Sequence, residues 1–322
     1  MNEAWVVLLK TASMFLVIGL GWLARRRGLV DAAAATAIGR LTVDVAFPAL
    51  VVTQLLKTVD PAALRHEWAV PLMGAFTLCL AGGVGLALRP FFSDRSGAPT
   101  FVFLVAIPNW IFLPLPIAEA LFGGDGVRQV LLFNVGAQAI LWTLGVWTLS
   151  GPGPARSDWK PLLLNPGILS TACGVALALC FPALRSFDSP GLRALWAAPL
   201  QGLAMAGSLT IPLSLLVTGM QMSGLEPGAK APELRPLAGV LLGRLLAAPL
   251  ASVAVLRLLA AAGWMPSPTA GRVVLLIAAM PVAVSCTVFA ERYSGDAALS
   301  ARAIFHTTLW SVLTVPVFCW LF

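Results

Sequence analysis

The chain of 322 residues is 59% hydrophobic and only 11% charged, and its mean hydropathy is +0.89. These values exclude a soluble domain with a polar surface and predict a polytopic membrane protein in contact with the lipid bilayer. The formal net charge of +7 would suit nucleic acid in a soluble protein, but here the basic residues lie in short loops between apolar runs, so nucleic acid is not expected as a partner.

Apolar runs long enough to cross a bilayer occur ten times along the chain. The first run ends in Arg25, Arg26 and Arg27 and lacks an Ala-x-Ala cleavage site, so we interpret it as a span and not as a signal peptide. The predicted spans cover residues 4–24, 36–56, 68–88, 99–121, 127–149, 162–184, 195–222, 236–262, 271–290 and 299–321.

The loops between these spans predict how the chain is oriented. The loops on one side carry twelve Lys and Arg residues, and those on the other side carry six. Because basic residues are enriched in cytoplasmic loops, both termini are predicted to lie outside, in a bacterial inner membrane. No loop is long enough for a soluble domain, so residues 1–322 are expected to form a single membrane domain.

The fourth span contains a segment that a continuous helix cannot accommodate. Residues 105–117 include Pro108, Pro114 and Pro116 together with Asn109. A proline inside a helix lacks a backbone N–H and costs about 3 kcal/mol or more. Irregular backbone at membrane depth persists only where protein or a wet cavity surrounds it, so we expect a broken helix at a central binding site.

The two halves of the chain show a weak internal repeat. Phe47-Pro-Ala-Leu is echoed by Ile211-Pro-Leu-Ser, and Gly124-Asp125 by Gly295-Asp296. Phe133-Asn134 is echoed by Phe305-His306, 172 residues later, and this spacing aligns Asn109 with Pro281, so the ninth span is also expected to break. Each half, about 1–155 and 156–322, has five predicted spans, and an odd number requires the second half to be inverted relative to the first.

Several stretches resemble the auxin efflux carrier family, the bacterial relatives of plant PIN carriers. They are Gly21-Trp-Leu-Ala-Arg-Arg-Arg-Gly28, Phe47-Pro-Ala-Leu50, Asn109 to Pro116, Asn165-Pro166, Ile211-Pro-Leu-Ser-Leu215, Met280-Pro281 and Thr307-Thr-Leu-Trp-Ser-Val-Leu-Thr-Val-Pro316. The resemblance implies an all-α fold of ten helices in two inverted repeats, like that of bile-acid symporters and sodium–proton antiporters, and a homodimer. It also implies a scaffold from residues 4–56 and 162–222, an elevator-like transport domain from 68–149 and 236–321, and crossing helices that meet at Pro116 and Pro281.

Polar residues near the two breaks are candidates for binding the cargo. The amide of Asn109 could grip a carboxylate together with freed backbone amides and helix N-termini, or it could only cap the broken helix. The resemblance favours binding, since the matching asparagine of relatives lies in the binding site. Ser285, Cys286 and Thr287 follow the second break, and their side chains could complete the site or bond back to helix carbonyls.

A second set of polar residues lies on the spans that follow each break. It consists of Asn134, Gln138, His306, Thr307 and Thr308. Asn134 and Gln138 are four residues apart and therefore share a helix face. The set could form a polar stripe facing a cavity, or it could join helices by hydrogen bonds.

Among the charged or titratable residues within spans, Asp44 and His306 could couple transport to protons, and Arg244 could act on the cargo. Asp44 is a candidate because a carboxylate inside a span is costly, although an ion pair with Arg40 is an alternative. His306 could titrate near neutral pH or simply pack. Arg244 could attract an anion, or its long side chain could reach the cytoplasmic surface. Neither Lys nor Arg occurs between Phe101 and Arg128 or between Arg272 and Arg292, so neutral donors are expected to bind an anion at the crossing.

The chain carries no pattern of an enzyme or of a metal or cofactor site. There is no HExxH, Walker or GxSxG motif, and the cysteines lie in apolar runs without metal-type spacing. We therefore predict a transporter of a small organic anion, with a carboxylate as cargo, driven by the membrane potential, protons or sodium. A sodium-coupled symporter of the bile-acid type and a non-transporting membrane receptor are the alternatives.

Overall fold

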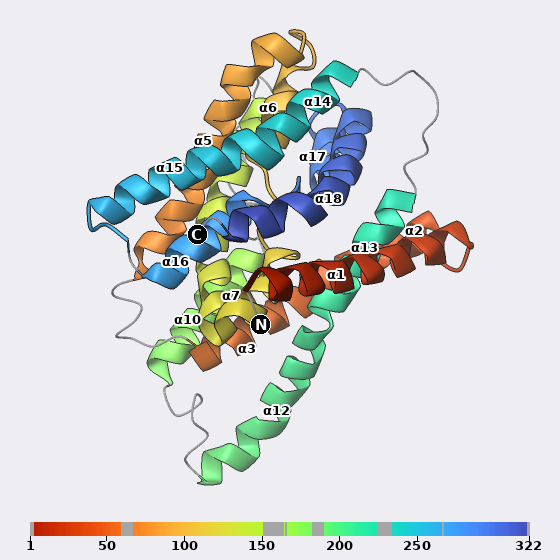
Figure 1. Cartoon of the computed structure of the whole chain (residues 1–322). Helices are drawn as coiled ribbons and strands as arrows, with labels where there is room; N and C mark the ends of the chain where they lie inside the picture. The colour runs from red at the N-terminus through yellow and green to blue at the C-terminus, as the bar shows by residue number, and fades with distance from the viewer. Residues whose placement is uncertain are drawn as a thin grey trace.

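The computed structural model describes residues 3–58, 67–150, 164, 166–181, 190–223, 234–265 and 267–320. All the regular secondary structure in these segments is helical (Figure 1). The helices are α1 Glu3–Arg26, α2 Ala32–Leu41, α3 Phe47–Thr58, α5 Ala69–Phe92, α6 Ala98–Ala106, α7 Pro114–Ile140, α8 Val146–Ser150, α10 Pro166–Cys180, α12 Pro190–Ser208, α13 Thr210–Ser223, α14 Leu234–Leu242, α15 Ala248–Ala261, α16 Pro268–Ala278, α17 Cys286–Arg292 and α18 Ala297–Trp320. The predicted junction of the repeats near residue 155 and the motif residue Asn165 lie outside the described residues.

Within the described segments, three π-helical turns join consecutive helices into longer rods. They are η1 Thr42–Ala46 between α2 and α3, η2 Leu141–Gly145 between α7 and α8, and η4 Gly243–Ala247 between α14 and α15. Within the described segments, five continuous helical stretches are long and apolar enough to cross a membrane: Ala32–Lys57, Ala69–Phe92, Pro114–Ser150, Ala197–Ser223 and Leu234–Ala261. This confirms a helical membrane protein, while the count of ten spans stays a prediction.

The stretch Pro114–Ser150 changes direction at Gly123. This residue has φ 59° and ψ −144°, a conformation that glycine adopts without steric cost. The sequence predicted a loop between its fourth and fifth spans at residues 122–126, and Gly123 lies inside it. The chain therefore turns where the two predicted spans meet.

Glycines let pairs of helices approach until their backbones touch. A Cβ atom on Gly219 of α13 would collide with the carbonyl oxygen of Ile18 in α1, and one on Gly136 of α7 would collide with that of Pro71 in α5. Small residues are typical of membrane helix interfaces because packing and not hydrophobicity holds such helices together.

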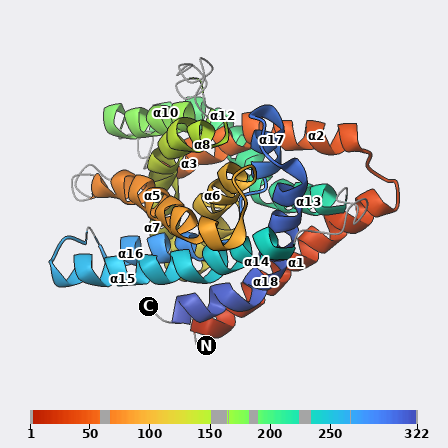
Figure 2. The same cartoon turned by 90° about the horizontal axis from the view of Figure 1, so that it is seen from above.

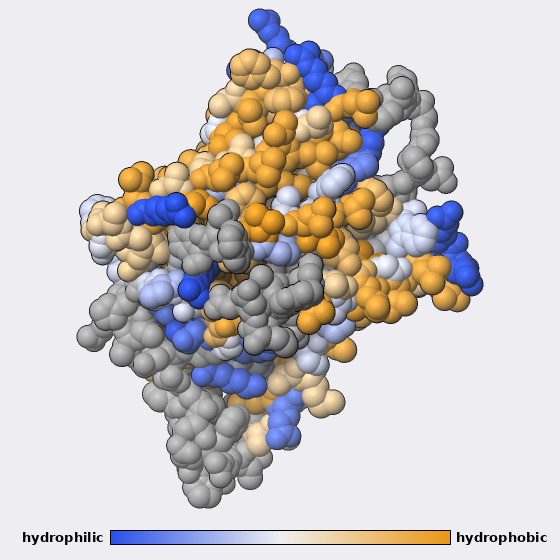
Figure 3. Space-filling view, viewed as in Figure 1, coloured by the Kyte–Doolittle hydropathy of each residue, from blue (hydrophilic) through white to orange (hydrophobic). Residues whose placement is uncertain are grey.

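The core lies around α6 and the neighbouring ends of α7 and α16. Every residue of α6 from Thr100 to Val105 is buried, as expected of a helix that is apolar all round. Seen from above, α6 lies in the middle, with α10 and α12 on one side and α14 and α15 on the other (Figure 2). Hydrophobic side chains cover much of the visible outer face, and hydrophilic ones gather at the end of α5 and at the tip between α1 and α2 (Figure 3).

Candidate functional site

Two helices are interrupted at the centre of the molecule, at both predicted places. α6 ends at Ala106 and α7 begins at Pro114, while α16 ends at Ala278 and α17 begins at Cys286. The intervening backbone is not helical and is mostly buried. The predicted breaks in the fourth and ninth spans are thus confirmed.

The two interrupted segments pair with each other. Pro108 and Val282 form an isolated antiparallel β-bridge. The Asn109 N–H donates to the Pro281 carbonyl at 2.7 Å, and the Ala283 N–H donates to the Ile107 carbonyl at 3.1 Å. Each break therefore satisfies backbone groups of the other, which buried backbone in a membrane requires.

Pro116 is not the proline that pairs with the second break. The residue paired with Val282 is Pro108, and the crossing at Pro116 that the resemblance implies stays a prediction. Pro116 lies in the first turn of α7, which begins at Pro114. Proline is tolerated in a first helical turn, because those N–H groups have no intrahelical acceptor in any case.

Asn109 is buried, and its two polar atoms differ in their partners. Its side-chain Oδ1 accepts a hydrogen bond from the Phe112 N–H at 3.1 Å, so it caps the break. Its Nδ2 donates to no residue in the described part of the chain. The oxygen thus performs the capping role that was one interpretation of this residue, and the nitrogen stays available to a ligand.

The start of α7 offers fewer free backbone N–H donors to an anion than the sequence led us to expect. Pro114 and Pro116 have no N–H, and the Leu115 N–H already donates to the Ile111 carbonyl at 3.0 Å. At the other break, Ser285 is exposed and makes no capping bond, while the Thr287 hydroxyl donates to the Val284 carbonyl at 3.2 Å. Of the two roles considered for Thr287, the structure shows the hydrogen bond to a carbonyl of the preceding turn.

Thr307 of α18 closes the second break. Its Oγ1 accepts from the Val282 N–H at 3.2 Å and donates to the Ala303 carbonyl at 2.6 Å. Its neighbours His306, half-buried, and Thr308, buried, make no described side-chain contact with the crossing. Thr307 is thus the residue of the predicted α18 set that reaches the paired segments.

Arg244 brings a positive charge to the crossing, and the sequence named it as a possible attractor of an anion without placing it there. It lies in η4 and is completely buried, so the expectation that its side chain reaches the cytoplasmic surface is wrong. Its guanidinium donates to the Val105 carbonyl at 2.7 Å and to the Ala278 carbonyl. These carbonyls belong to the last turns of α6 and α16, where the helix dipole leaves partial negative charge. The only signal in the sequence was a basic residue inside an apolar run.

Asn134 and Gln138 lie on one face of α7, next to the crossing. Asn134 is fully buried, and its Oδ1 accepts from the indole Nε1 of Trp110 at 3.0 Å. Asn134 Nδ2, Gln138 Oε1 and the Nε1 of Trp142 in η2 are buried without a hydrogen-bond partner. Polar atoms that lack partners in the interior are candidates for binding a ligand or water.

Asp44 lies away from this site. It is exposed in η1, and it forms no ion pair with Arg40 among the described residues. The structure brings together Asn109, Pro281, Thr307 and, through Trp110, Asn134. It does not bring Asp44 to them.

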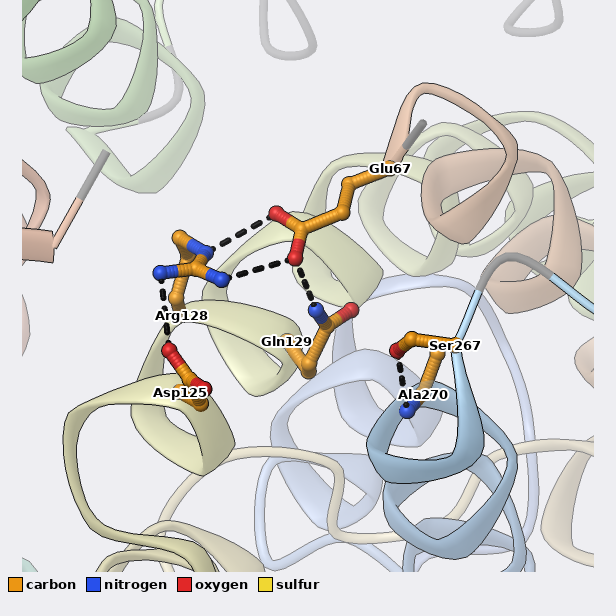
Figure 4. Close-up of polar contacts among 6 residues, drawn as sticks. All are labelled: Glu67, Asp125, Arg128, Gln129, Ser267 and Ala270. Atoms are coloured by element: carbon orange, nitrogen blue, oxygen red, sulfur yellow. Dashed lines mark hydrogen bonds and ion pairs between the residues drawn. The ribbon is translucent and has the colours of Figure 1, made fainter. Parts of the chain in front are cut away.

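A buried ion-pair network lies where α5 begins and α7 has turned at Gly123 (Figure 4). Arg128 forms a bidentate pair with Glu67 at 2.7 and 2.8 Å and an ion pair with Asp125 at 3.0 Å, and the Gln129 amide donates to Glu67 at 2.7 Å. Asp125 itself keeps a largely exposed side chain. The missed signal was a pair of opposite charges, Glu67 and Arg128, next to the ends of two predicted spans on the same side of the membrane. In the described segments no group of three His, Cys, Asp or Glu could hold a metal ion.

Comparisons with known proteins agree with this architecture. A family model described as "Membrane transport protein" matches residues 6–156 and 153–319. An uncharacterized transporter of Methanothermobacter thermautotrophicus is 24% identical over 313 residues, which cover 95% of each chain. An uncharacterized transporter of Methanocaldococcus jannaschii is 21% identical over 317 residues, which cover 96% of each chain.

Proposed function

The chain belongs to the membrane transport protein family, and from this premise we propose that it is a secondary transporter of a small organic anion. The membership confirms the resemblance to the auxin efflux carriers, and the family groups the chain with transporters and not with enzymes. The proposed cargo is a carboxylate, either auxin-like or a dicarboxylate, and the proposed mechanism is alternating access.

The observation that carries the proposal is the pairing of two buried helix interruptions beside an uncompensated positive charge. Arg244 is completely buried, and its guanidinium donates to two carbonyl groups and to no carboxylate in the described part of the chain. Its charge is fixed at any physiological pH. A buried charge without a counter-ion favours the entry of an anion, so Arg244, and not neutral donors alone, supports an anionic cargo.

The cargo carboxylate is proposed to accept a hydrogen bond from Nδ2 of Asn109. The Oδ1 atom of the same amide already accepts a hydrogen bond from the Phe112 N–H. Asn134 and Gln138, with buried polar atoms that lack partners, extend the proposed site along α7. Ser285 and Thr287 border it after the second break. Pro116 and Pro281 shape the backbone of the two segments, with Pro281 accepting the bond from Asn109.

Movement is proposed to follow the elevator mechanism, with ten spans in two inverted repeats. The scaffold is proposed to comprise residues 4–56 and 162–222, and the transport domain residues 68–149 and 236–321. Packing is consistent with this division, because α1 packs chiefly against α13 and α3 against α10 and α12, whereas α5, α7, α14 and α16 pack among themselves. The T-shaped contact of Phe112 with Phe47, at 6.3 Å, lies at the proposed sliding interface.

Orientation, assembly and coupling are further parts of the proposal. The start of α1 and the end of α18 lie close together in both views, which is consistent with termini on the same, outer side of a bacterial inner membrane (Figures 1 and 2). Joining of scaffold helices would form a homodimer, which native mass spectrometry in lipid would detect. Protonation of Asp44 or His306 is the proposed coupling step.

Flux through proteoliposomes tests the function. Full-length protein would be reconstituted, and uptake of radiolabelled benzoate, indole-3-acetate, malate and succinate compared with that of choline, a cation of similar size. We expect saturable uptake of at least one carboxylate and none of choline, with imposed voltage, proton and sodium gradients applied separately.

Each alternative has its own outcome in this experiment. Uptake that requires sodium would indicate a bile-acid-type symporter, and binding without flux would indicate a receptor. Uptake that responds equally to pH in wild type and in an Asp44→Asn, His306→Gln double variant would remove both residues as coupling sites. Uptake of choline but of no carboxylate would contradict an anionic cargo.

A further inference from the structure

A cavity of about 520 Å³ lies between α5, α6 and the segment η2–α8. Its walls are mostly apolar, and Arg89 and Arg95 lie at one end. At the other end it reaches Ala106 and Ile107, where α6 enters the break. The cavity touches the paired segments only at Ile107, and neither Asn134 nor Gln138 of α7 lines it.

Missing side chains create this space. Gly82 and Gly83 of α5 and Gly145 of η2 line it. A Cβ atom on Gly83 would meet nothing within 4 Å, and one on Gly82 would only touch the Ala106 side chain at 3.7 Å. Elsewhere on α5 a Cβ on Gly74 would press against the backbone of Phe133. The open glycines of α5 therefore face a space that no other part of the described chain fills.

The length of the cavity corresponds to one leaflet of a bilayer. On α5 it extends from Leu78 to Arg89, about 16 Å at about 1.5 Å per residue. Half of a hydrocarbon core of about 30 Å is about 15 Å. A single acyl chain that begins at the interface would thus end near the level of the crossing.

The cavity has a basic end and an apolar body, which is complementary to a lipid with an anionic headgroup and an apolar chain. Arg89 and Arg95 are exposed and form no ion pair among the described residues. A third arginine, Arg235, donates to the Phe91 carbonyl at the same end of α5. The nearby Asp94 accepts from the Ser96 hydroxyl and the Gly97 N–H, and these bonds lower its pKa, so it stays ionised. Three positive charges against one negative leave this end basic.

We propose that this groove binds an anionic phospholipid, with one acyl chain along Gly82 and Gly83 and the headgroup phosphate at Arg89 and Arg95. The end away from the arginines is lined by Leu78, Ala106 and Ile107, whose apolar side chains offer no hydrogen bond to a carboxylate. A small organic anion that entered this end would lose the water around its carboxylate and find no hydrogen-bond donor in its place. An acyl chain, by contrast, is stabilised there by the burial of its apolar surface. The proposal requires a membrane protein but does not depend on which cargo the crossing carries.

Native mass spectrometry of the purified full-length protein tests the proposal. Delipidated protein would be titrated with phosphatidylglycerol, with phosphatidylcholine of the same acyl chains, and with inorganic phosphate. We expect at least tenfold stronger retention of phosphatidylglycerol than of phosphatidylcholine. Equal retention of the two lipids would overturn the proposal, and so would occupation by inorganic phosphate that displaces the lipid, because the site would then bind a free anion.

Two pairs of variants locate the site. Gly83→Phe fills the groove, and Gly19→Phe is its control, because Gly19 also has nothing within 4 Å of an added Cβ but lies on α1. Arg89→Gln with Arg95→Gln removes the headgroup contacts, and Arg25→Gln with Arg27→Gln removes the same charge elsewhere. We expect the preference for phosphatidylglycerol to disappear in the first member of each pair and to persist in the second.

The arginine pair remains informative if Gly83→Phe does not fold, because both arginine side chains are exposed and form no hydrogen bond or ion pair among the described residues. An unchanged preference in the Arg89→Gln, Arg95→Gln variant would refute the headgroup contact. Equal loss in the test and control variants would mean that the preference reflects total charge and not this groove.

Discussion

At the scale of single residues, Asn109 shows how one side chain can hold the backbone and still offer a binding group. Its oxygen accepts from the Phe112 N–H, while its nitrogen has no partner in the described structure. A cap and a ligand contact are therefore not exclusive. Substitutions that separate the two polar atoms can distinguish them.

Asn109→Asp keeps an oxygen to cap the Phe112 N–H but replaces the free donor with negative charge. We expect thermal stability close to wild type and a loss of carboxylate binding of tenfold or more, equivalent to about 1.4 kcal/mol. Asn109→Ala should lose both the cap and the binding. Calorimetry on folded samples measures the affinity of each variant for the carboxylate that shows the largest flux. Wild-type affinity in the aspartate variant would reduce Asn109 to a cap.

Substitution of Glu67 should lower the free energy of unfolding substantially. Glu67→Gln leaves the buried Arg128 with Asp125 as its remaining carboxylate, and Asp125 is largely exposed. Breaking a buried ion pair from one side costs about 3–5 kcal/mol, and we expect a value near the lower limit because Asp125 remains. Chemical unfolding in detergent measures the change. A Glu67→Leu, Arg128→Met double variant that is no more stable than Glu67→Gln would contradict an unpaired charge as the cause.

At the scale of elements, Arg244 holds the ends of two helices that are distant in the sequence. The carbonyls of Val105 and Ala278 would be unsatisfied in an apolar interior without it. Each unsatisfied buried group costs about 1–3 kcal/mol. The arginine thus stabilises the crossing as well as supplying charge.

Arg244→Met should therefore lower the melting temperature and abolish anion uptake, although part of the stability loss is offset because a buried charge is removed. Arg244→Lys keeps the charge but not the two-branched geometry, so it should retain some uptake at reduced stability. Differential scanning fluorimetry and flux on the same preparations give both values. Full carboxylate uptake by the methionine variant would show that the charge does not attract the cargo.

The glycine contacts between helices should be equally sensitive. Gly136→Ala drives a methyl group into the Pro71 carbonyl, so α5 and α7 must separate and the folded yield should fall sharply. Gly19→Ala is the matched control, because it meets nothing and gains about 1 kcal/mol of helix propensity. Size-exclusion chromatography of both variants measures the folded fraction. Equal yields would mean that the helices can part at no cost.

At the scale of the whole molecule, the charge of the loops predicts the orientation of the chain in the membrane. With twelve basic residues in one set of loops and six in the other, both termini should be outside. Single cysteines placed at residues 2 and 321 of a cysteine-free variant should react with an impermeant maleimide in intact cells. A cysteine at residue 95 should react only after lysis, and the reverse pattern would invert the proposed orientation.

The sequence by itself determined where the chain breaks, because proline acts on its own backbone and its effect needs no distant partner. It also determined the membrane class, since apolar run length is a local property. It did not determine which proline pairs with the other break: Pro108 and Pro116 both disfavour a helix interior, and only the tertiary structure joins Pro108 to Val282.

Only the tertiary structure decided what surrounds these breaks. Arg244 lies 139 residues from Val105 in the chain, and Arg128 lies 61 residues from Glu67, yet each pair is joined by hydrogen bonds. Periodicity and motifs report on neighbours along the chain, whereas the cost of burying a charge depends on which groups other helices bring to it. The absence of Lys and Arg around both breaks therefore predicted a neutral crossing, and a third helix supplied the charge.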